Sequence, residues 1–279
     1  MTHLKEISIQ IRRDILRMIH NAKSGHTGGA LGSTEYFIAL FYKVMFFHTK
    51  KIEGKEEDLF FLSNGHISPV LYSVLARKGY FSLDELKRFR KINSRLQGHP
   101  SLYENLPGIH VASGSLGQGM SVALGAAQSK KIYNDPYLSF SFHGDGEINE
   151  GQNWEAILYA GAKKVDNYIA TIDYNYQQID GNTDKVMHLG NIKMKFESFG
   201  WQVLVETKGN CIFSVIKILQ KAKKKAKKGK PICIILHTEM GHGVSFMNGN
   251  YQWHGKSPND EELKKALHKL PESIGDYDK

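Results

Sequence analysis

Five short segments, each composed mostly of apolar residues, alternate along the chain with stretches of helical periodicity. They span residues 58–63, 137–143, 168–174, 201–207 and 231–239. Strands that are apolar on both faces must be covered on both sides, and helical connections join strands that run in the same direction. The sequence therefore predicts an α/β fold with three layers (α/β/α) and a mostly parallel central sheet. The predicted helices include residues 7–22, 33–46, 68–79, 82–92, 118–132 and 150–165.

Length and composition favour a single domain over residues 1–279. The chain has 279 residues, of which 41% are hydrophobic, and it contains no internal repeat and no Pro/Ser-rich linker. No window approaches the roughly 18 consecutive apolar residues of a membrane span, and the first residues lack the apolar core of a secretion signal. Its two cysteines, Cys211 and Cys233, fit a reducing compartment. We therefore expect a cytoplasmic protein that does not contact a membrane.

Two predicted helix ends carry informative residues. Ser33 opens the helix of residues 33–46 and is expected to act as its N-cap. The net charge of +9 comes largely from the lysine-rich run 221–230, which follows the helical segment 211–220. Cations suit the negative end of a helix dipole, and the run has no interleaved aromatic residues that could stack on bases. It is interpreted as a solvated helix end, and no nucleic acid partner is expected.

Asp145 follows a predicted strand directly and is flanked by two glycines, which leave room for a phosphate or a metal ion to approach the backbone. The next predicted strand ends in polar residues that include Asn175. A right-handed crossover would place the two strand ends side by side. Carboxylate and amide oxygens suit Mg²⁺ when phosphate oxygens and water complete its shell. The pair therefore predicts a magnesium–diphosphate site, whereas a tight turn with Asp145 as a helix cap is the structural alternative.

A second glycine-rich loop, GSLGQG at residues 114–119, opens a predicted helix. Glycines at a helix start allow backbone N–H groups to approach an anion. The spacing matches neither the dinucleotide fingerprint nor the nucleoside triphosphate loop. Close packing of a helix on a strand is the alternative explanation of these glycines.

Four histidines lie beside glycines in turn-like segments: His26, His66, His99 and His254. Imidazole can transfer protons near neutral pH and can donate hydrogen bonds to phosphate or sugar oxygens. Any one of them is more often a surface residue, but four such loops in one chain favour a shared pocket. The spacing does not indicate that these histidines bind a metal.

Six segments carry a more specific combination of motifs: LSNGHISPVLYSVL (62–75), QGHP (97–100), GSLGQGMSVALGAA (114–127), GDGEINEGQNWEA (144–156), DYNYQQIDG (173–181) and GVSFMNGNYQWHGKSP (243–258). Together they resemble the thiamine diphosphate-binding domain of transketolases. The similarity covers almost the whole chain, from about residue 24 to about residue 258. It implies a thiamine diphosphate-binding fold with thiamine diphosphate and Mg²⁺ as cofactors.

The resemblance also implies the roles of individual residues. Mg²⁺ would be held by the side chains of Asp145 and Asn175 and by the carbonyl oxygen of Gln177. The residues expected to bind the cofactor are His66, Gly114, Ser115, Leu116, Asp145, Gly146, Glu150 and Asn175.

The same resemblance implies a catalytic set. His66 would contact the diphosphate, and His26, His99 and His254 would line the substrate channel, where they orient hydroxyl groups and move protons. Glu150 is similar to a family glutamate at the domain contact that couples cofactor sites across the assembly.

Three departures from the family pattern affect these expectations. Tyr174 precedes Asn175 where the family has Asp or Asn, and Met240 stands where some relatives have a cation that could touch phosphate. The chain also stops where a transketolase continues with a pyrimidine-binding domain and a C-terminal domain. The resemblance therefore implies the N-terminal subunit of a split transketolase, inactive without a C-terminal partner subunit and assembled as α2β2.

The implied reaction is transfer of a two-carbon ketol unit from a ketose phosphate to an aldose phosphate. The alternatives are a subunit of another thiamine diphosphate enzyme (deoxyxylulose-phosphate synthase-like or oxo-acid dehydrogenase-like), a nicotinamide-dependent dehydrogenase, and a non-catalytic cofactor-binding module. The sequence does not identify the sugar pair.

Overall fold

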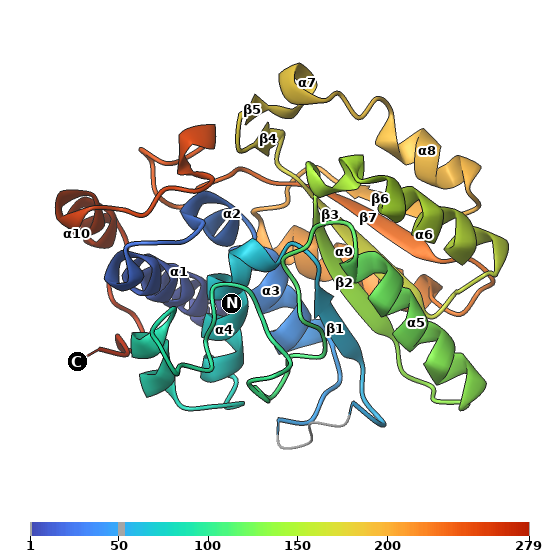
Figure 1. Cartoon of the computed structure of the whole chain (residues 1–279), viewed down its shortest axis with the longest axis horizontal. Coiled ribbons are helices and arrows are strands. Elements are labelled where there is room, and N and C mark those ends of the chain that lie inside the picture. Colours follow the sequence, from blue (N-terminus) through green and yellow to red (C-terminus); the bar gives the residue numbers. More distant parts are fainter. Residues whose placement is uncertain (1, 50–53, 279) are drawn as a thin grey trace.

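The computed structural model describes residues 2–49 and 54–278, so the predicted domain boundaries at 1 and 279 lie outside the described residues. A five-stranded parallel sheet with the strand order β1-β2-β3-β7-β6 forms the centre of the molecule (Figure 1). Its strands are β1 (Leu59–Leu62), β2 (Ser139–Gly144), β3 (Tyr168–Tyr174), β6 (Gln202–Glu206) and β7 (Ile232–His237). Every strand predicted from the sequence is present, and the prediction of a parallel sheet is confirmed.

Helices cover both faces of this sheet (Figure 1). The α-helices are α1 (Thr2–Ala22), α2 (Thr27–Gly32), α3 (Thr34–Ala39), α4 (Ser68–Arg77), α5 (Gly119–Ile132), α6 (Gly151–Ala162), α7 (Thr183–Val186), α8 (Ile192–Ser198), α9 (Ile212–Lys225) and α10 (Asp260–Lys269). Short 3-10 helices occupy Gly65–Ile67, Leu83–Arg88, Glu147–Asn149 and Tyr251–Trp253, and a π-helical turn, Leu40–Val44, extends α3. A small hairpin is formed by β4 (Gln177–Gln178) and β5 (Gly181–Asn182).

Side chains of the strands alternate between two apolar cores, which explains why the strands are apolar on both faces. Phe140 and Phe142 of β2 pack in one core with residues of α1, α3, α4 and α9. Tyr168, Ala170 and Ile172 of β3 pack in the other core with residues of α5, α6 and α8. A strand with a period of two needs apolar residues at every position when both of its faces are covered. The three-layer prediction is therefore confirmed.

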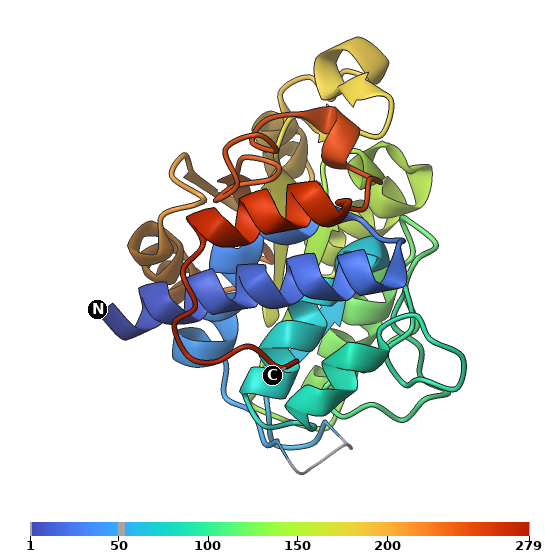
Figure 2. The ribbon, with the colours of Figure 1, turned by 90° about the vertical axis from the view of Figure 1, so that its left-hand side faces the viewer.

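The amino-terminal helix α1 lies across the outside of one helical layer, with α10 beside it (Figure 2). The carboxyl-terminal tail returns to α1, where Asp276 forms ion pairs with Arg13 and Arg17. No helix in the described parts of the chain is long and apolar enough to cross a bilayer.

Three local expectations from the sequence need correction. Residues 82–92 form only the 3-10 helix Leu83–Arg88, because few of its residues are buried and Arg90, with φ of 57°, turns the chain away. The Ser33 hydroxyl donates to the carbonyl of Gly29 and does not cap α3, because α2 ends immediately before it. The lysine run is helical only as far as Lys225.

The strand order places the carboxyl ends of β2 and β3 next to each other. From β3 the chain continues in the same direction to β6 at the far edge, and it then turns back to place β7 between β6 and β3. In the β2–β3 register Gly144 is paired with Asp173. Ligands of open α/β sheets bind beyond such carboxyl ends. The fold therefore predicts a ligand site at this edge of the sheet.

Candidate functional site

A cavity of about 410 Å³ lies at the carboxyl edge of the sheet. It is bordered by residues that follow β1, β2 and β3, by the start of α2 and by loop residues near 99, 114 and 254. The structure brings together at this cavity the predicted residues His26, His66, His99, Gly114, Leu116, Asp145, Gly146, Glu150, Asn175, Gln177 and His254. Ser115 does not line the cavity. Its side chain is exposed, and its hydroxyl accepts a hydrogen bond from Gln118.

Asp145 is buried at the end of β2, with 1% of its surface exposed. Its carboxylate accepts hydrogen bonds from the backbone N–H groups of Gly146 and Tyr176, both at 2.8 Å, and from the hydroxyl of Thr183 at 3.3 Å. Tyr176 adopts a left-handed conformation with φ of 64°, which folds the segment after β3 over this carboxylate. Asp145 and the segment around Asn175 are therefore neighbours, as the crossover argument predicted.

Asp173, the partner of Gly144 in the adjacent strand, is a second buried carboxyl group at this position. It accepts a hydrogen bond from the hydroxyl of Thr238 and another from the amide nitrogen of Asn175 at 3.1 Å. Because Nδ2 of Asn175 faces Asp173, its Oδ1 atom faces away from this carboxylate and accepts the N–H of Gln177 at 2.9 Å.

The two carboxyl groups share an environment that disfavours negative charge. Burial raises the pKa of Asp145 to about 7, and the nearby charge of Asp173 adds to this effect. Burial also raises the pKa of Asp173 to about 6. Within the described residues, neither carboxylate has a lysine, arginine or histidine at ion-pair distance. A bound cation would remove this penalty.

The chemistry of these donors fits Mg²⁺. The described residues contain no group of three or more His, Cys, Asp or Glu side chains arranged for a metal ion. The potential ligands are instead oxygens of mixed type, from the carboxylate of Asp145, the amide of Asn175 and the backbone at Gln177. Hard oxygen donors in small number, with room for phosphate oxygens and water, are the set that Mg²⁺ prefers.

Glycine is required in the loop of residues 114–119 for conformational and steric reasons. Gly114 and Gly117 have φ values of 132° and 90°, which other residues rarely adopt. A Cβ atom on Gly65 would lie 2.8 Å from the carbonyl carbon of Ser113, so the turn after β1 packs directly against this loop. The loop thus approaches the end of β1 on one side and the cavity on the other.

Three of the four predicted histidines form a compact cluster in the cavity wall. The ring centroids of His26 and His66 are 4.9 Å apart, those of His66 and His254 are 5.3 Å apart, and those of His26 and His254 are 5.5 Å apart. His99 lines the same cavity beside Gly114, where its ring would be 2.9 Å from a Cβ atom placed on that glycine, and its charge contributes to lowering the pKa of His26 and His66.

The histidine rings are held neutral near pH 7. Burial, with the charges of neighbouring histidines and Arg90, lowers the pKa of His26 to about 4. The pKa of His66 lies well below its ordinary value because of burial and the charges of the neighbouring histidines, and burial also lowers the pKa of His99 and His254. The Nδ1 atoms of His26 and His254 are buried and have no hydrogen-bond partner in the described structure. Neutral rings of this kind can both donate to and accept from the hydroxyl groups of a ligand.

Sequence reasoning missed Asp173, Thr183 and Glu147, which all contact predicted site residues or their loops. Asp173 begins the segment DYNYQQIDG but lies inside a strand and was given no role there, and Thr183 lies beyond the hairpin, outside every motif. Glu147 immediately follows Gly146 and is buried. An acidic residue within an otherwise apolar, buried stretch was the available signal for Asp173.

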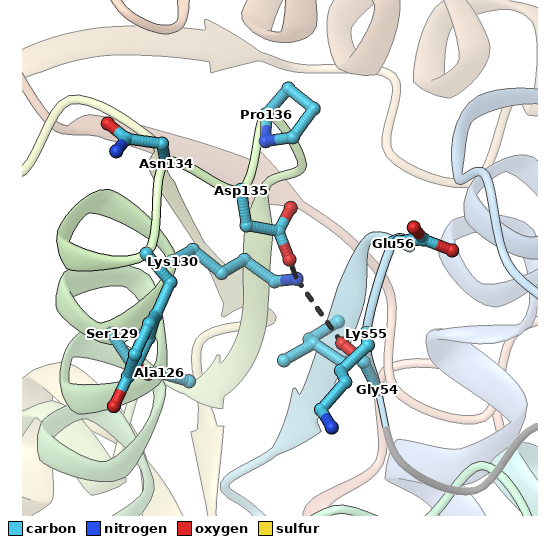
Figure 3. Close-up of a pocket in the computed structure, with 11 residues that line it drawn as sticks. Gly54, Lys55, Glu56, Ala126, Ser129, Lys130, Asn134, Asp135 and Pro136 are labelled. Atoms are coloured by element: carbon cyan, nitrogen blue, oxygen red, sulfur yellow. Dashed lines mark hydrogen bonds and ion pairs between the residues drawn. The ribbon is translucent and has the colours of Figure 1, made fainter.

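A larger cavity, of about 870 Å³, lies at the opposite, amino-terminal edge of the sheet (Figure 3). It is bordered by residues before β1, by the end of α5 and by the loop before β2. Lys130 extends into it and is already bonded to the carboxylate of Asp135 at 2.7 Å and to the carbonyl of Gly54 at 3.3 Å. This cavity contains none of the predicted site residues, so its size alone does not make it the functional site.

Comparison with known proteins identifies the family of this chain. Residues 5–273 match the family model of the transketolase thiamine diphosphate binding domain. The chain is 34% identical to an apulose-4-phosphate transketolase subunit of Phocaeicola vulgatus, over 96% of this chain and 94% of that protein. It is 35% identical to the 6-deoxy-6-sulfo-D-fructose transketolase subunit SqwG of Clostridium sp., over 93% of each chain.

Complete transketolases are longer. The chain is 33% identical to the transketolase of Homo sapiens over 91% of its own length, but it spans only 40% of that enzyme. The structure of transketolase from Campylobacter jejuni superposes with a TM-score of 0.91 at 32% identity, covering 99% of this chain and 44% of that one. Transketolase from Leishmania mexicana gives the same TM-score at 29% identity, with 42% of its chain covered. The chain therefore belongs to the transketolase family, within which it corresponds to the thiamine diphosphate binding domain.

Proposed function

We propose that the chain is the cofactor-binding subunit of a two-chain transketolase, which transfers a two-carbon ketol unit from a ketose phosphate to an aldose phosphate. The observation that carries this proposal is one cavity lined both by two buried carboxyl groups, which have no cationic side chain at ion-pair distance among the described residues, and by a cluster of neutral histidines. The family membership supports the reaction class. The relatives act, by their names, on different sugars, so the donor and acceptor are left open.

The cofactors of this function are thiamine diphosphate and Mg²⁺. Asp145, Asn175 and the carbonyl of Gln177 would hold the metal ion, with Asp145 buried and the other two residues partly exposed, which leaves room for water and phosphate oxygens in the shell. The backbone near Gly114 and Gly146 would approach the diphosphate, since neither residue has a side chain in the way. When bound, thiamine diphosphate supplies the carbon nucleophile that the protein itself lacks.

The histidines would bind the hydroxyl groups of the sugar substrate. His26 and His254 face each other and are neutral, so their ring nitrogens can accept hydrogen bonds from sugar hydroxyls and donate to them, whereas His66 beside them would contact the diphosphate. His99 lines the same cavity beside Gly114, where it can bind a second hydroxyl.

A partner chain would complete the site. The curated relatives that match over nearly their whole length are named as transketolase subunits, whereas the chain spans only about two fifths of complete transketolases. Leu116 and Glu150 lie at the cavity rim with exposed side chains, so a second chain can cover them. We propose that this partner is a C-terminal transketolase subunit, in an α2β2 assembly. The assembly would work in the cytoplasm, where the free thiols of Cys211 and Cys233 stay reduced.

The first test combines the chain with a C-terminal transketolase subunit. Ketol transfer is expected only in the mixture and only with Mg²⁺ and thiamine diphosphate present. Asp145→Ala should abolish cofactor-dependent activity and the cofactor-induced rise in melting temperature, because the buried ligand is lost. Asp84→Ala, a surface change remote from the cavity, is the control and should behave as the unchanged chain. Full activity of the chain alone, or of Asp145→Ala in the mixture, would overturn the proposal.

A further inference from the structure

Glu147 places a buried carboxylate between two glycine loops of the cavity. Only 2% of its surface is exposed. Its Oε1 atom accepts the backbone N–H of Gly117 at 2.9 Å, and its Oε2 atom accepts the backbone N–H of Gly144 at 3.2 Å. The hydroxyl of Ser63, at the end of β1, also donates to Oε1. One side chain therefore connects three separate segments.

The position of this carboxylate is fixed by its surroundings. The amide of Asn153 donates to the backbone carbonyl of Glu147 at 2.7 Å. Nδ1 of the fully buried His143 lies 3.6 Å from Oε2, and Nε2 of the same ring is 2.7 Å from the hydroxyl of Ser141. Buried polar groups that are linked in this way have little freedom to move.

Few other hydrogen bonds fix the distance between the two glycine loops. In the described structure, the hydrogen bonds to Glu147 are the only ones that link residues 114–119 with residues 143–146. The loop of residues 114–119 contains two glycines with positive φ, and glycine-rich backbone has many accessible conformations. Without the hydrogen bonds to Glu147, only packing contacts, such as those with the turn after β1, would hold this loop at its distance from Gly146.

We propose that Glu147 is a positioning residue that fixes the distance between loop 114–119 and the Asp145 segment, so that one diphosphate group can contact both. This inference rests on the proposed function, because it assigns the diphosphate of the cofactor to the space between the loops. Glu147 is not one of the proposed metal ligands. Its effect on the ligand is transmitted through the two backbone N–H groups that it holds.

The substitution Glu147→Gln tests the two hydrogen bonds that Glu147 accepts from Gly117 and Gly144, and it leaves the volume of the side chain almost unchanged. A glutamine has one acceptor oxygen, so one glycine N–H loses its partner and faces the new NH2 group. We expect the affinity for thiamine diphosphate with Mg²⁺ to fall roughly 10–100-fold, the effect typical of changes behind a metal site. Ser63→Ala is the matched control, because it removes a donor from the same carboxylate and leaves both glycine contacts intact. Its cofactor affinity should change by less than about threefold.

Calorimetric titration of the full chain, mixed with the C-terminal partner, measures these affinities, and thermal unfolding of each variant shows that it is folded. Equal affinity of Glu147→Gln and the unchanged chain would overturn the inference. So would a loss of affinity in Ser63→Ala as large as that in Glu147→Gln, since the effect would then follow general destabilisation.

Amide hydrogen exchange gives a second readout that needs neither cofactor nor a folded Glu147 variant. The N–H groups of Gly117 and Gly144 should exchange slowly in the unchanged chain, because both are bonded to a buried carboxylate. Exchange of Gly117 at the rate of an exposed loop would refute this role of Glu147. If the unchanged chain with its partner failed to bind thiamine diphosphate, the proposed function would fail, while this measurement would still decide whether Glu147 holds the loops together.

Discussion

Asp145 and Asp173 are neighbouring carboxyl groups that the fold keeps away from water and from cationic side chains. Their pKa values in the folded chain, about 7 and about 6, lie above the ordinary value of 3.8. Between about pH 4 and pH 7 these two groups therefore bind more protons in the folded chain than in the unfolded chain. Their contribution to the free energy of unfolding falls as pH rises through this window. Ionisation of these two carboxyl groups therefore destabilises the folded chain. A divalent cation bound at this position would offset the destabilisation.

Stabilisation by Mg²⁺ and thiamine diphosphate should consequently depend on pH. At pH 5 most Asp145 carboxyl groups are protonated and compete with the metal ion, whereas at pH 8 they are ionised and free to bind it. We expect a clearly larger rise in melting temperature on adding both cofactors at pH 8 than at pH 5. Asp173→Asn should lower the pKa of Asp145 and extend the cofactor effect to lower pH. An equal rise at both pH values would contradict the assignment of Asp145 as a ligand.

Residues of the candidate site differ in how far the sequence could predict them. Asp145 and Asn175 could be proposed because each follows a strand, and parallel strands end at the same edge of a sheet. The histidines could be grouped because glycine-flanked loops gather at that edge. Glu147 and Thr183 could not be predicted, because their roles depend on which backbone N–H groups or carboxylate oxygens the folded loops bring close to them.

At the scale of elements, the carboxyl-terminal tail is held to α1 by Asp276. This carboxylate is 1% exposed and forms ion pairs with Arg13 and Arg17 at 2.5 and 2.6 Å. Burial acts to raise its pKa, but hydrogen bonds from Arg13 and Gln10 and the charges of the arginines hold the pKa below 3.8. The stabilisation is therefore present above about pH 4 and is lost as pH falls below that value.

Asp276→Ala should lower the free energy of unfolding by about 3 kcal/mol, because it leaves buried arginine without its partner. Urea unfolding at pH 7 measures this change. Asp278→Ala removes a more exposed carboxylate whose ion pair, among the described residues, is with Arg17, so its effect should stay below about 1 kcal/mol. The difference between the two variants should shrink as the pH is lowered below about 4. If Asp276→Ala lowered the free energy of unfolding as little as Asp278→Ala, the ion pairs of Asp276 would not stabilise the packing of the tail on α1.

Long elements could be predicted from the sequence, and short ones could not. The strands and helices such as α5 and α6 have enough residues for a period of two or 3.6 to be visible. The hairpin β4–β5 has two residues in each strand, and α2 is rich in glycine, so neither has a usable pattern. The lysine run leaves the helix because the N–H of Lys227, with φ of 63°, bonds to the carbonyl of Asp166. That contact lies far away in sequence and has no local signal.

At the scale of the whole molecule, we expect the outer face of α5 and α6 to contact the proposed partner subunit. Both helices begin beside the cavity, close to the exposed Leu116 and Glu150. Their outer sides expose Val122, Leu158 and Tyr159, and a groove of about 440 Å³ separates the two helices. A chain that completes the cavity above this edge would cover these apolar side chains as well. Large apolar contacts of this kind are typical of permanent subunit interfaces.

Leu158→Lys should therefore weaken assembly without damaging the chain itself. The side chain is 54% exposed on α6, so the isolated chain should keep its melting temperature to within about 2 °C, as expected for a surface change. In the mixture, a charged group buried at the interface should reduce both the amount of complex and the ketol-transfer activity at least tenfold, measured by sedimentation and by activity at limiting partner concentration. Ile132→Lys, which changes an exposed apolar residue at the other end of α5, should leave both unchanged. Normal assembly of Leu158→Lys would place the partner on a different face, and equal losses in both variants would indicate a nonspecific effect of the added charge.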